Sequence, residues 1–148
     1  MIARIRKSME EKDQGFTLIE LLVVMIIIGI LAAIAIPVFL NQRAKARDTA
    51  ARADVSTLGK ELAAYYVDGT GAAPTITLNT TTGHYNYAAG TVGVDQDLGP
   101  YSDNVTAVAT SGTDDTDWCV QVDYDNGTQG TVTYSAAAGL GDLGSTCP

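Results

Sequence analysis

A glutamate stands at the start of the longest apolar stretch of the chain. From Leu21 to Leu40 the sequence contains no charged residue, which is about the length that crosses a bilayer core roughly 30 Å thick. Glu20 directly precedes this stretch, four residues after Phe16, where the apolar pattern begins. A charged side chain at bilayer depth costs on the order of 3 kcal/mol, so such residues usually mark a function and a partner. Glu20 is therefore the first candidate site residue.

The two cysteines form the second group with possible chemistry. Cys119 and Cys147 are an even number of thiols in a chain with a membrane segment, which suggests export and oxidation. A bridge between them would stabilise the fold by roughly 3 to 4 kcal/mol. Two unpaired, buried thiols are the alternative. Zinc-ligand spacing is absent and His84 is the single histidine, so no structural zinc site is expected.

No group of residues has the pattern of a catalytic site. His84 lies in a Tyr/Asn/Gly segment without a nucleophile motif, and no phosphate-binding glycine loop precedes a helix. The segment DYDNG, residues 123–127, has its glycine one place too early for an EF-hand and predicts a hairpin turn. The segment DDTD, residues 114–117, is read as a solvated acidic loop. We expect no enzymatic activity, no cofactor and no metal site.

Charge is distributed very unevenly along the chain. Residues 1–60 hold all nine Lys and Arg and carry a net charge of +3, whereas residues 61–148 have none and carry −11. A surface without Lys or Arg cannot neutralise phosphates, so direct nucleic-acid binding by the later part is not expected. The basic segment 41–54 is interpreted as a solvated helix face with lipid headgroup contacts. Glycosylation triplets at Asn79, Asn104 and Asn126 are expected by chance in so Thr-rich a region.

The apolar pattern predicts one long helix from Phe16 to about Val67. Its first half is apolar on every face, as in a membrane or bundle-core helix. At 1.5 Å per residue the helix would be about 78 Å long, so half of it must project beyond a bilayer. Gly29 and Pro37 interrupt it, and a kink or loosened turn is expected near Ala33 to Pro37. The second half has an apolar stripe with steps of three and four, formed by Ala51, Val55, Leu58, Leu62, Tyr65 and Tyr66.

The remaining residues, 69–148, are rich in Thr and Gly, which favours strands and turns. The clearest element is a hairpin over residues 118–136 with its turn at 125–130. Residues 104–110 and 84–88 predict further strands. Large apolar side chains are few, so the sheet is expected to pack on the helix stripe and to depend on the disulfide. The glycines of segment 68–74 are expected to end the helix.

Residues Gly15–Pro37, GFTLIELLVVMIIIGILAAIAIP, together with VFLNQRAKA after them, resemble the N-terminus of type IV pilins and their relatives. These relatives are the pseudopilins of type II secretion and the competence pilins. The likeness covers about a fifth of the chain. It implies an α+β fold of ladle shape, a long helix packed on a small antiparallel sheet. It also implies four segments: a cleaved leader (1–15), a transmembrane or filament-core helix (16–40), an amphipathic helix half (41–68) and a sheet-containing head (69–148).

The resemblance assigns roles to individual residues. Gly15 would be the last leader residue, cut from Phe16 by a prepilin peptidase, and Phe16 would then be N-methylated. Glu20 matches the family's acidic residue and would pair with the new α-amine of a neighbouring copy, which sets the register between subunits. Pairing with its own amine at headgroup level is the alternative.

Further positions follow from the same resemblance. Gly29 and Pro37 match the family's helix-loosening positions. Cys119 and Cys147 look like the pair that closes the family's C-terminal loop. Similar numbers of basic residues flank the apolar segment on both sides, so the positive-inside rule gives no orientation. Orientation therefore depends on the leader motif and the cysteines.

The resemblance implies a structural subunit of a type IV pilus-like filament, with possible roles in adhesion, motility or DNA uptake. Its partners would be further copies of the chain, the prepilin peptidase, an inner-membrane assembly platform, a separate motor ATPase and, before assembly, membrane lipid. The chain would be a single-pass precursor in the inner membrane and then part of a surface pilus. A pseudopilin, competence or minor pilin is the first alternative. A membrane-tethered binding module that never polymerises is the second.

Overall fold

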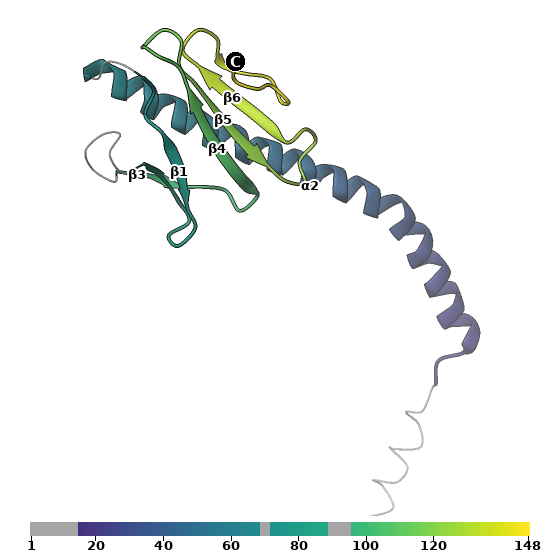
Figure 1. Ribbon diagram of the computed structural model, residues 1–148. Helices are drawn as coiled ribbons and strands as arrows, with labels where there is room; N and C mark the ends of the chain where they lie inside the picture. Colours follow the sequence, from purple (N-terminus) through teal and green to yellow (C-terminus); the bar gives the residue numbers. More distant parts are fainter. Residues whose placement is uncertain (1–14, 69–71, 89–95) are drawn as a thin grey trace, which may run out of the picture. The chain divides into compact units, whose positions relative to one another are not determined.

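The computed structural model describes residues 15–68, 72–88 and 96–148. In these ranges the chain forms one helix and seven strands (Figure 1). They are α2 (Leu18–Asp68), β1 (Ile76–Asn79), β2 (His84–Tyr87), β3 (Asp97–Pro100), β4 (Val105–Ser111), β5 (Cys119–Tyr124), β6 (Thr131–Ser135) and β7 (Gly139–Leu140). The predicted α+β class is confirmed. The expected leader, except for Gly15, and the helix-ending glycines Gly69 and Gly71 lie outside the described residues.

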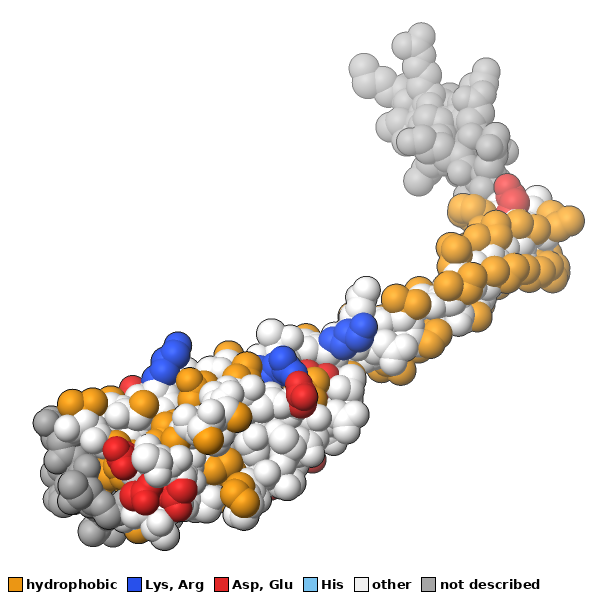
Figure 2. Space-filling view, turned by 90° about the horizontal axis from the view of Figure 1, so that it is seen from above, with side chains coloured by type: hydrophobic (Ala, Val, Ile, Leu, Met, Phe, Trp, Pro, Cys, Tyr) orange, Lys and Arg blue, Asp and Glu red, His pale blue; other side chains and the backbone are white. Residues whose placement is uncertain are grey.

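The chain divides into two units, residues 1–40 and 41–148. In the first, the described part is apolar helix whose large side chains, from Phe16 to Leu40, leave between 47% and 81% of their surface exposed (Figure 2). An 18-residue window of α2 reaches a mean hydropathy of 3.1, and none of it is buried. This helix passes the length and composition test for a membrane span. The described part of this unit has no core of its own, so its apolar surface needs lipid or other helices.

The helix continues through both positions where an interruption was expected. α2 is continuous through Gly29 and Pro37. Pro37 has no backbone N–H, so the helix lacks one hydrogen bond at this turn. The loosening expected at these two positions stays a prediction.

The second unit, the head, consists of the helix from residue 41 onward and two antiparallel sheets. One sheet has the order β1-β2-β3 and the other the order β4-β5-β6-β7. The expected sheet is therefore divided in two, and Figure 1 shows both sheets lying along the same helix. The predicted hairpin is confirmed as β5 and β6, with Val122 opposite Val132. The strands expected at 84–88 and 104–110 are confirmed as β2 and β4.

The core of the head is built on the helix stripe. Ala51, Val55, Leu58 and Leu62 are completely buried. They share one cluster with side chains of both sheets, namely Ile76, Tyr85, Tyr87, Leu98, Val105, Trp118, Val120, Val122, Tyr124 and Val132. The predicted packing of the sheet on the stripe is confirmed. A stack of rings continues this packing: the Trp118 ring lies between those of Tyr66 and Tyr134, with centroids 6.5 and 6.0 Å away.

The two cysteines are joined. Cys119 and Cys147 form a disulfide with their Cα atoms 5.8 Å apart, so the alternative of two free thiols is wrong. The bridge ties the end of the chain to the first residue of β5. The Gln121 side chain supports the same segment, since its Oε1 accepts a hydrogen bond from the Cys147 N–H at 3.1 Å.

The sequence pattern does not predict β1, β3 or β7. β1 offers only Ile76 and Leu78 as alternating apolar residues, and β7 has two residues. β3 contains Gly99 and Pro100, which are disfavoured inside strands. It lies at the edge of its sheet, where proline is tolerated because no neighbour needs its missing N–H.

Gly59 gives a test of the helix-to-sheet contact. In an unhindered helix, alanine is about 1 kcal/mol more favourable than glycine. A Cβ at Gly59 would overlap the Tyr134 ring, so we expect Gly59→Ala to lower the free energy of unfolding by about 1 to 3 kcal/mol. Urea unfolding of the detergent-solubilised chain, followed by Trp118 fluorescence, measures this change. The exposed control Ala53→Gly should lose about 1 kcal/mol, and a stabilised Gly59→Ala variant would contradict the tight contact.

Candidate assembly site

The start of α2 is closed by a reciprocal pair of hydrogen bonds between Thr17 and Glu20. The Glu20 N–H donates to Thr17 Oγ1 at 3.3 Å, and the Thr17 N–H donates to Glu20 Oε2 at 2.8 Å. The Thr17 hydroxyl also donates to Glu20 Oε2, at 2.7 Å. This is a capping box, which satisfies backbone donors that a helix start leaves without partners. The T-x-x-E spacing before an apolar run is the sequence signal of this capping box.

The capping box leaves half of the Glu20 carboxylate available. Both bonds that the carboxylate accepts go to Oε2, and within the described part of the chain Oε1 accepts none. Glu20 is exposed, and its negative charge is favoured at the positive end of the helix dipole. The carboxylate is thus held in place by its own chain and can still accept a donor from elsewhere.

The predicted cleavage point lies directly before this cap. Gly15 and Phe16 precede the first helical residue and are in non-helical backbone, and Phe16 leaves 81% of its surface exposed. Every atom of the capping box belongs to Thr17 or Glu20, so a cut between Gly15 and Phe16 would not remove it. An apolar hollow of about 390 Å³, lined by Phe16, Ile19, Val23 and their neighbours, adjoins Glu20.

A second set of polar contacts fixes loops of the head to the helix. Asp48 is only 5% exposed and accepts hydrogen bonds from the Tyr124 hydroxyl at 3.0 Å and from the Thr128 N–H at 2.8 Å. Its other oxygen accepts from the Thr128 hydroxyl at 2.5 Å. Burial alone would raise the pKa of Asp48, but the bonds from Thr128 and Tyr124 and the charge of Arg52 lower it below its ordinary value. Asp48 therefore holds the β5–β6 turn as a carboxylate.

Asp54 has the same role toward another loop. Its Oδ2 accepts from the Ser102 N–H at 2.8 Å and from the Tyr85 hydroxyl at 3.2 Å, and its Oδ1 accepts from the Ser102 hydroxyl at 3.1 Å. The loop between β3 and β4 is thereby tied to the helix. Sequence reasoning placed both aspartates among the solvated residues around the stripe, because nothing local indicates partners from 31 to 80 residues away.

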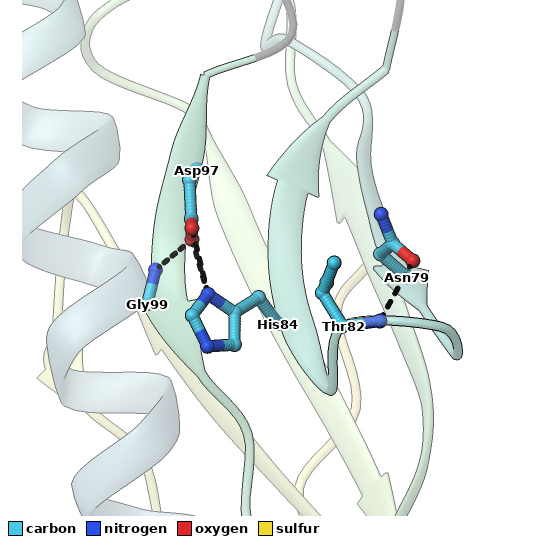
Figure 3. A network of polar contacts seen from close by, with 5 residues as sticks. All are labelled: Asn79, Thr82, His84, Asp97 and Gly99. Atoms are coloured by element: carbon cyan, nitrogen blue, oxygen red, sulfur yellow. Dashed lines mark hydrogen bonds and ion pairs between the residues drawn. The ribbon is translucent and has the colours of Figure 1, made fainter.

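The single histidine is engaged across the three-stranded sheet. His84 Nδ1 lies 2.7 and 2.8 Å from the two carboxylate oxygens of Asp97, and the Gly99 N–H donates to Asp97 Oδ1 at 2.8 Å (Figure 3). The Gly99 bond, followed by that of His84, lowers the pKa of Asp97. At the neighbouring β1–β2 turn, Asn79 Oδ1 accepts from the Thr82 N–H at 3.2 Å (Figure 3). The contact between His84 and Asp97 joins β2 to β3, and the bond to Asn79 stabilises the β1–β2 turn.

The apolar start of the chain matches a known family. The model described as the prokaryotic N-terminal methylation motif matches residues 12–36. The chain is 49% identical over 47 residues to the type IV major pilin protein PilA of Myxococcus xanthus, a match covering 32% of this chain and 21% of that protein. It is 54% identical over 46 residues to a fimbrial protein of Pseudomonas aeruginosa, covering 31% and 30%.

A secretion protein is similar over a comparable length. The type II secretion system core protein G of Pseudomonas aeruginosa is 39% identical over 61 residues, 40% of this chain and 43% of that protein. The N-terminal part of the chain is thus similar to type IV pilins and to type II secretion pseudopilins. None of these relatives carries the name of an enzyme. The matches span between about a fifth and two fifths of the relatives' lengths. No solved structure matches the chain significantly.

Asp48 gives the head a pH dependence with a defined sign. Because folding lowers its pKa below the unfolded value of about 4, its contribution to stability is present above that pH and is lost as the pH falls through the folded pKa. We expect Asp48→Asn to destabilise the head by about 1 to 3 kcal/mol at neutral pH. In urea unfolding, the stabilities of wild type and Asp48→Asn should converge as the pH falls through the folded pKa of Asp48.

A matched control separates this effect from general charge loss. Asp115 is exposed, and Asp115→Asn should change stability by less than about 0.5 kcal/mol at any pH. A constant difference between wild type and Asp48→Asn down to low pH would show that the Asp48 charge does not stabilise the turn.

Proposed function

We propose that the chain is a filament subunit, cut between Gly15 and Phe16 and assembled through its apolar helix. One observation carries this proposal. The most apolar 18-residue stretch of the helix is not buried at all in the described structure, yet the first helical turn holds a carboxylate that is fixed by a capping box. Lipid satisfies such a surface before assembly. In a bundle, like helices would replace the lipid contacts, so extraction from the membrane is tolerable.

The carboxylate gives the bundle a register. Removal of the leader would create an α-ammonium on Phe16, and N-methylation, as in the family, would keep its positive charge. Glu20 Oε1, which has no partner within the described residues, supplies a charged acceptor for the ammonium of a neighbouring copy. The apolar hollow beside Glu20 supports the same contact, because it offers space for a side chain of that neighbour. The axial offset of the two groups would then set the stagger between subunits.

The partners and location follow from this scheme. The chain would be inserted as a single-pass precursor in the inner membrane and processed there by a prepilin peptidase. An assembly platform and a separate motor ATPase would move it into the fibre. The head, which carries a net charge of −11 over residues 61–148, would form the outer surface of the filament. Adhesion, motility and DNA uptake are roles that such a surface can serve.

A second candidate is a pseudopilin that forms a short secretion piston. The similarity to type II secretion system core protein G supports it, because the chain is 39% identical to that protein over 61 residues. Deletion of the gene discriminates the two. Loss of abundant shed fibres supports the pilin, whereas loss of protein secretion without loss of fibres supports the pseudopilin.

Two substitutions separate the charge of Glu20 from its capping role. Glutamine serves at this position of a capping box as glutamate does, so Glu20→Gln keeps the cap and removes the charge. An unpaired ammonium buried in the bundle costs about 3 to 5 kcal/mol, which corresponds to at least a hundredfold less assembly. We expect Glu20→Gln to insert normally and form no fibres, as judged by electron microscopy of sheared material.

Thr17→Ala is the matched variant. It removes the cap, at a cost of about 1 kcal/mol, and keeps the charge, so we expect fibres in reduced amount. Fibres from Glu20→Gln together with failure of Thr17→Ala would assign Glu20 to helix capping alone. Mass measurement of each chain checks that both variants are processed equally.

The intact mass of the purified wild-type chain tests processing itself. We expect a chain that begins at Phe16, carries one N-terminal methyl group and has lost two hydrogens to the Cys119–Cys147 bridge. A chain that still begins at Met1 would indicate a membrane-tethered module that does not polymerise. A cut without polymerisation in any envelope fraction would also count against the filament.

A further inference from the structure

A groove with charges of both signs lies on the head, at the first turns of its helix. Its volume is about 670 Å³. The α2 side contributes Arg43 and Arg47, and the loops before β4 and after β5 contribute Asp103 and Asp125. None of these four residues belongs to the hydrophobic core of the head. The groove therefore needs an explanation of its own.

The walls of the groove are held by the protein. Asp54 fixes the loop before β4, and Asp48 fixes the turn after β5. Arg47 also bridges the two sides, because its Nη1 donates to the Asn126 carbonyl at 3.3 Å and its own carbonyl accepts from Asn104 Nδ2 at 3.4 Å. A ligand would thus meet a preformed site.

The carboxylates of the groove are not neutralised by the fold. Within the described residues, neither the Asp103 nor the Asp125 side chain forms a hydrogen bond or ion pair. Arg47 contacts a neutral carbonyl, which leaves its positive charge uncompensated. A ligand that carries a phosphate and a nearby ammonium would complement both pairs at once, since guanidinium binds phosphate and carboxylate accepts N–H donors.

The position of the arginines indicates where such a ligand is found. Arg43 and Arg47 follow Leu40, the last residue of the uncharged stretch, by three and seven residues. Three residues of backbone span at most about 11 Å, and the headgroup layer of a bilayer extends about 5 to 8 Å beyond the hydrocarbon core. In a membrane-anchored chain, the chain connection alone would keep Arg43 within reach of phospholipid headgroups, since arginine side chains can extend toward them.

We propose that this groove binds the phosphoethanolamine headgroup of a membrane phospholipid. Arg43 and Arg47 hold the phosphate, and Asp103 and Asp125 hold the primary ammonium. An anionic headgroup without an ammonium is repelled by these two aspartates. A choline headgroup has no N–H to donate, whereas a primary ammonium has three. The inference rests on the proposed membrane-anchored form, not on filament assembly.

Lipid retention by the processed chain, which begins at Phe16 and includes the whole head, tests the proposal. The chain is placed in nanodiscs with equal parts of phosphatidylethanolamine, phosphatidylglycerol and phosphatidylcholine, and native mass spectrometry records the lipids that stay bound on release. We expect phosphatidylethanolamine to exceed each of the others about fivefold or more. The double variants Arg43→Gln/Arg47→Gln and Asp103→Asn/Asp125→Asn should both lose this preference. Lys45→Gln and Asp115→Asn, which change charges outside the groove, should keep it.

Each of the other outcomes refutes a specific part of the proposal. Equal retention of the three lipids overturns the site. A preference for phosphatidylglycerol, or loss of retention in the arginine variant alone, reduces it to an unspecific basic patch and also overturns it. Flotation with vesicles is measured on the same chains: failure to float refutes the membrane-anchored form, whereas floating without lipid preference refutes only the groove.

Discussion

One helix face serves both sheets of the head, and the rest of the head depends on it. Four side chains of α2 from Ala51 to Leu62 are completely buried, and they pack in one cluster with residues of the three-stranded and the four-stranded sheet. Small sheets need such a partner, because each sheet must bury its apolar face against another element to be stable. Gly59 belongs to the same constraint, since its missing side chain lets the Tyr134 ring approach the helix. The helix from residue 41 onward and the two sheets are therefore one folding unit.

The parts of this fold that sequence reasoning found are those with strong periodicity. The stripe, the hairpin of β5 and β6, and the disulfide were predicted because 3.6-residue spacing, strict alternation and an even number of cysteines beside a membrane segment are strong signals. β3 was not found, because a strand with Gly99 and Pro100 forms only through pairing with β2. The roles of Asp48 and Asp54 were also missed. Their partners are distant in sequence, so an aspartate on the polar side of a helix looks solvated until the loops are placed.

The start of the helix shows a different kind of omission. The Thr17–Glu20 capping box has a local sequence signature. The apolar residues around it, by contrast, indicate only that a charge at this position is costly. The two views are compatible, because the cap uses one carboxylate oxygen and leaves the other. A side chain that is fixed locally loses little conformational freedom when it later binds a neighbour, which favours a specific contact over a diffuse attraction.

The same apolar surface can serve in two environments because the hydrophobic force that brings helices together is absent in the bilayer and strong outside it. In the bilayer, lipid tails are as apolar as the helix, so nothing hydrophobic draws two helices together and subunits can remain separate. Outside the bilayer, each exposed large apolar side chain costs about 1.5 to 3 kcal/mol, so the surface from Phe16 to Leu40 strongly favours a bundle. Apolar contact has no direction and cannot choose one stagger among many. A charge pair within the proposed bundle could, since every misaligned arrangement would leave Glu20 Oε1 and an ammonium desolvated without each other. Cohesion and register would thus have separate physical origins, the first spread over the whole apolar segment and the second concentrated in a single carboxylate.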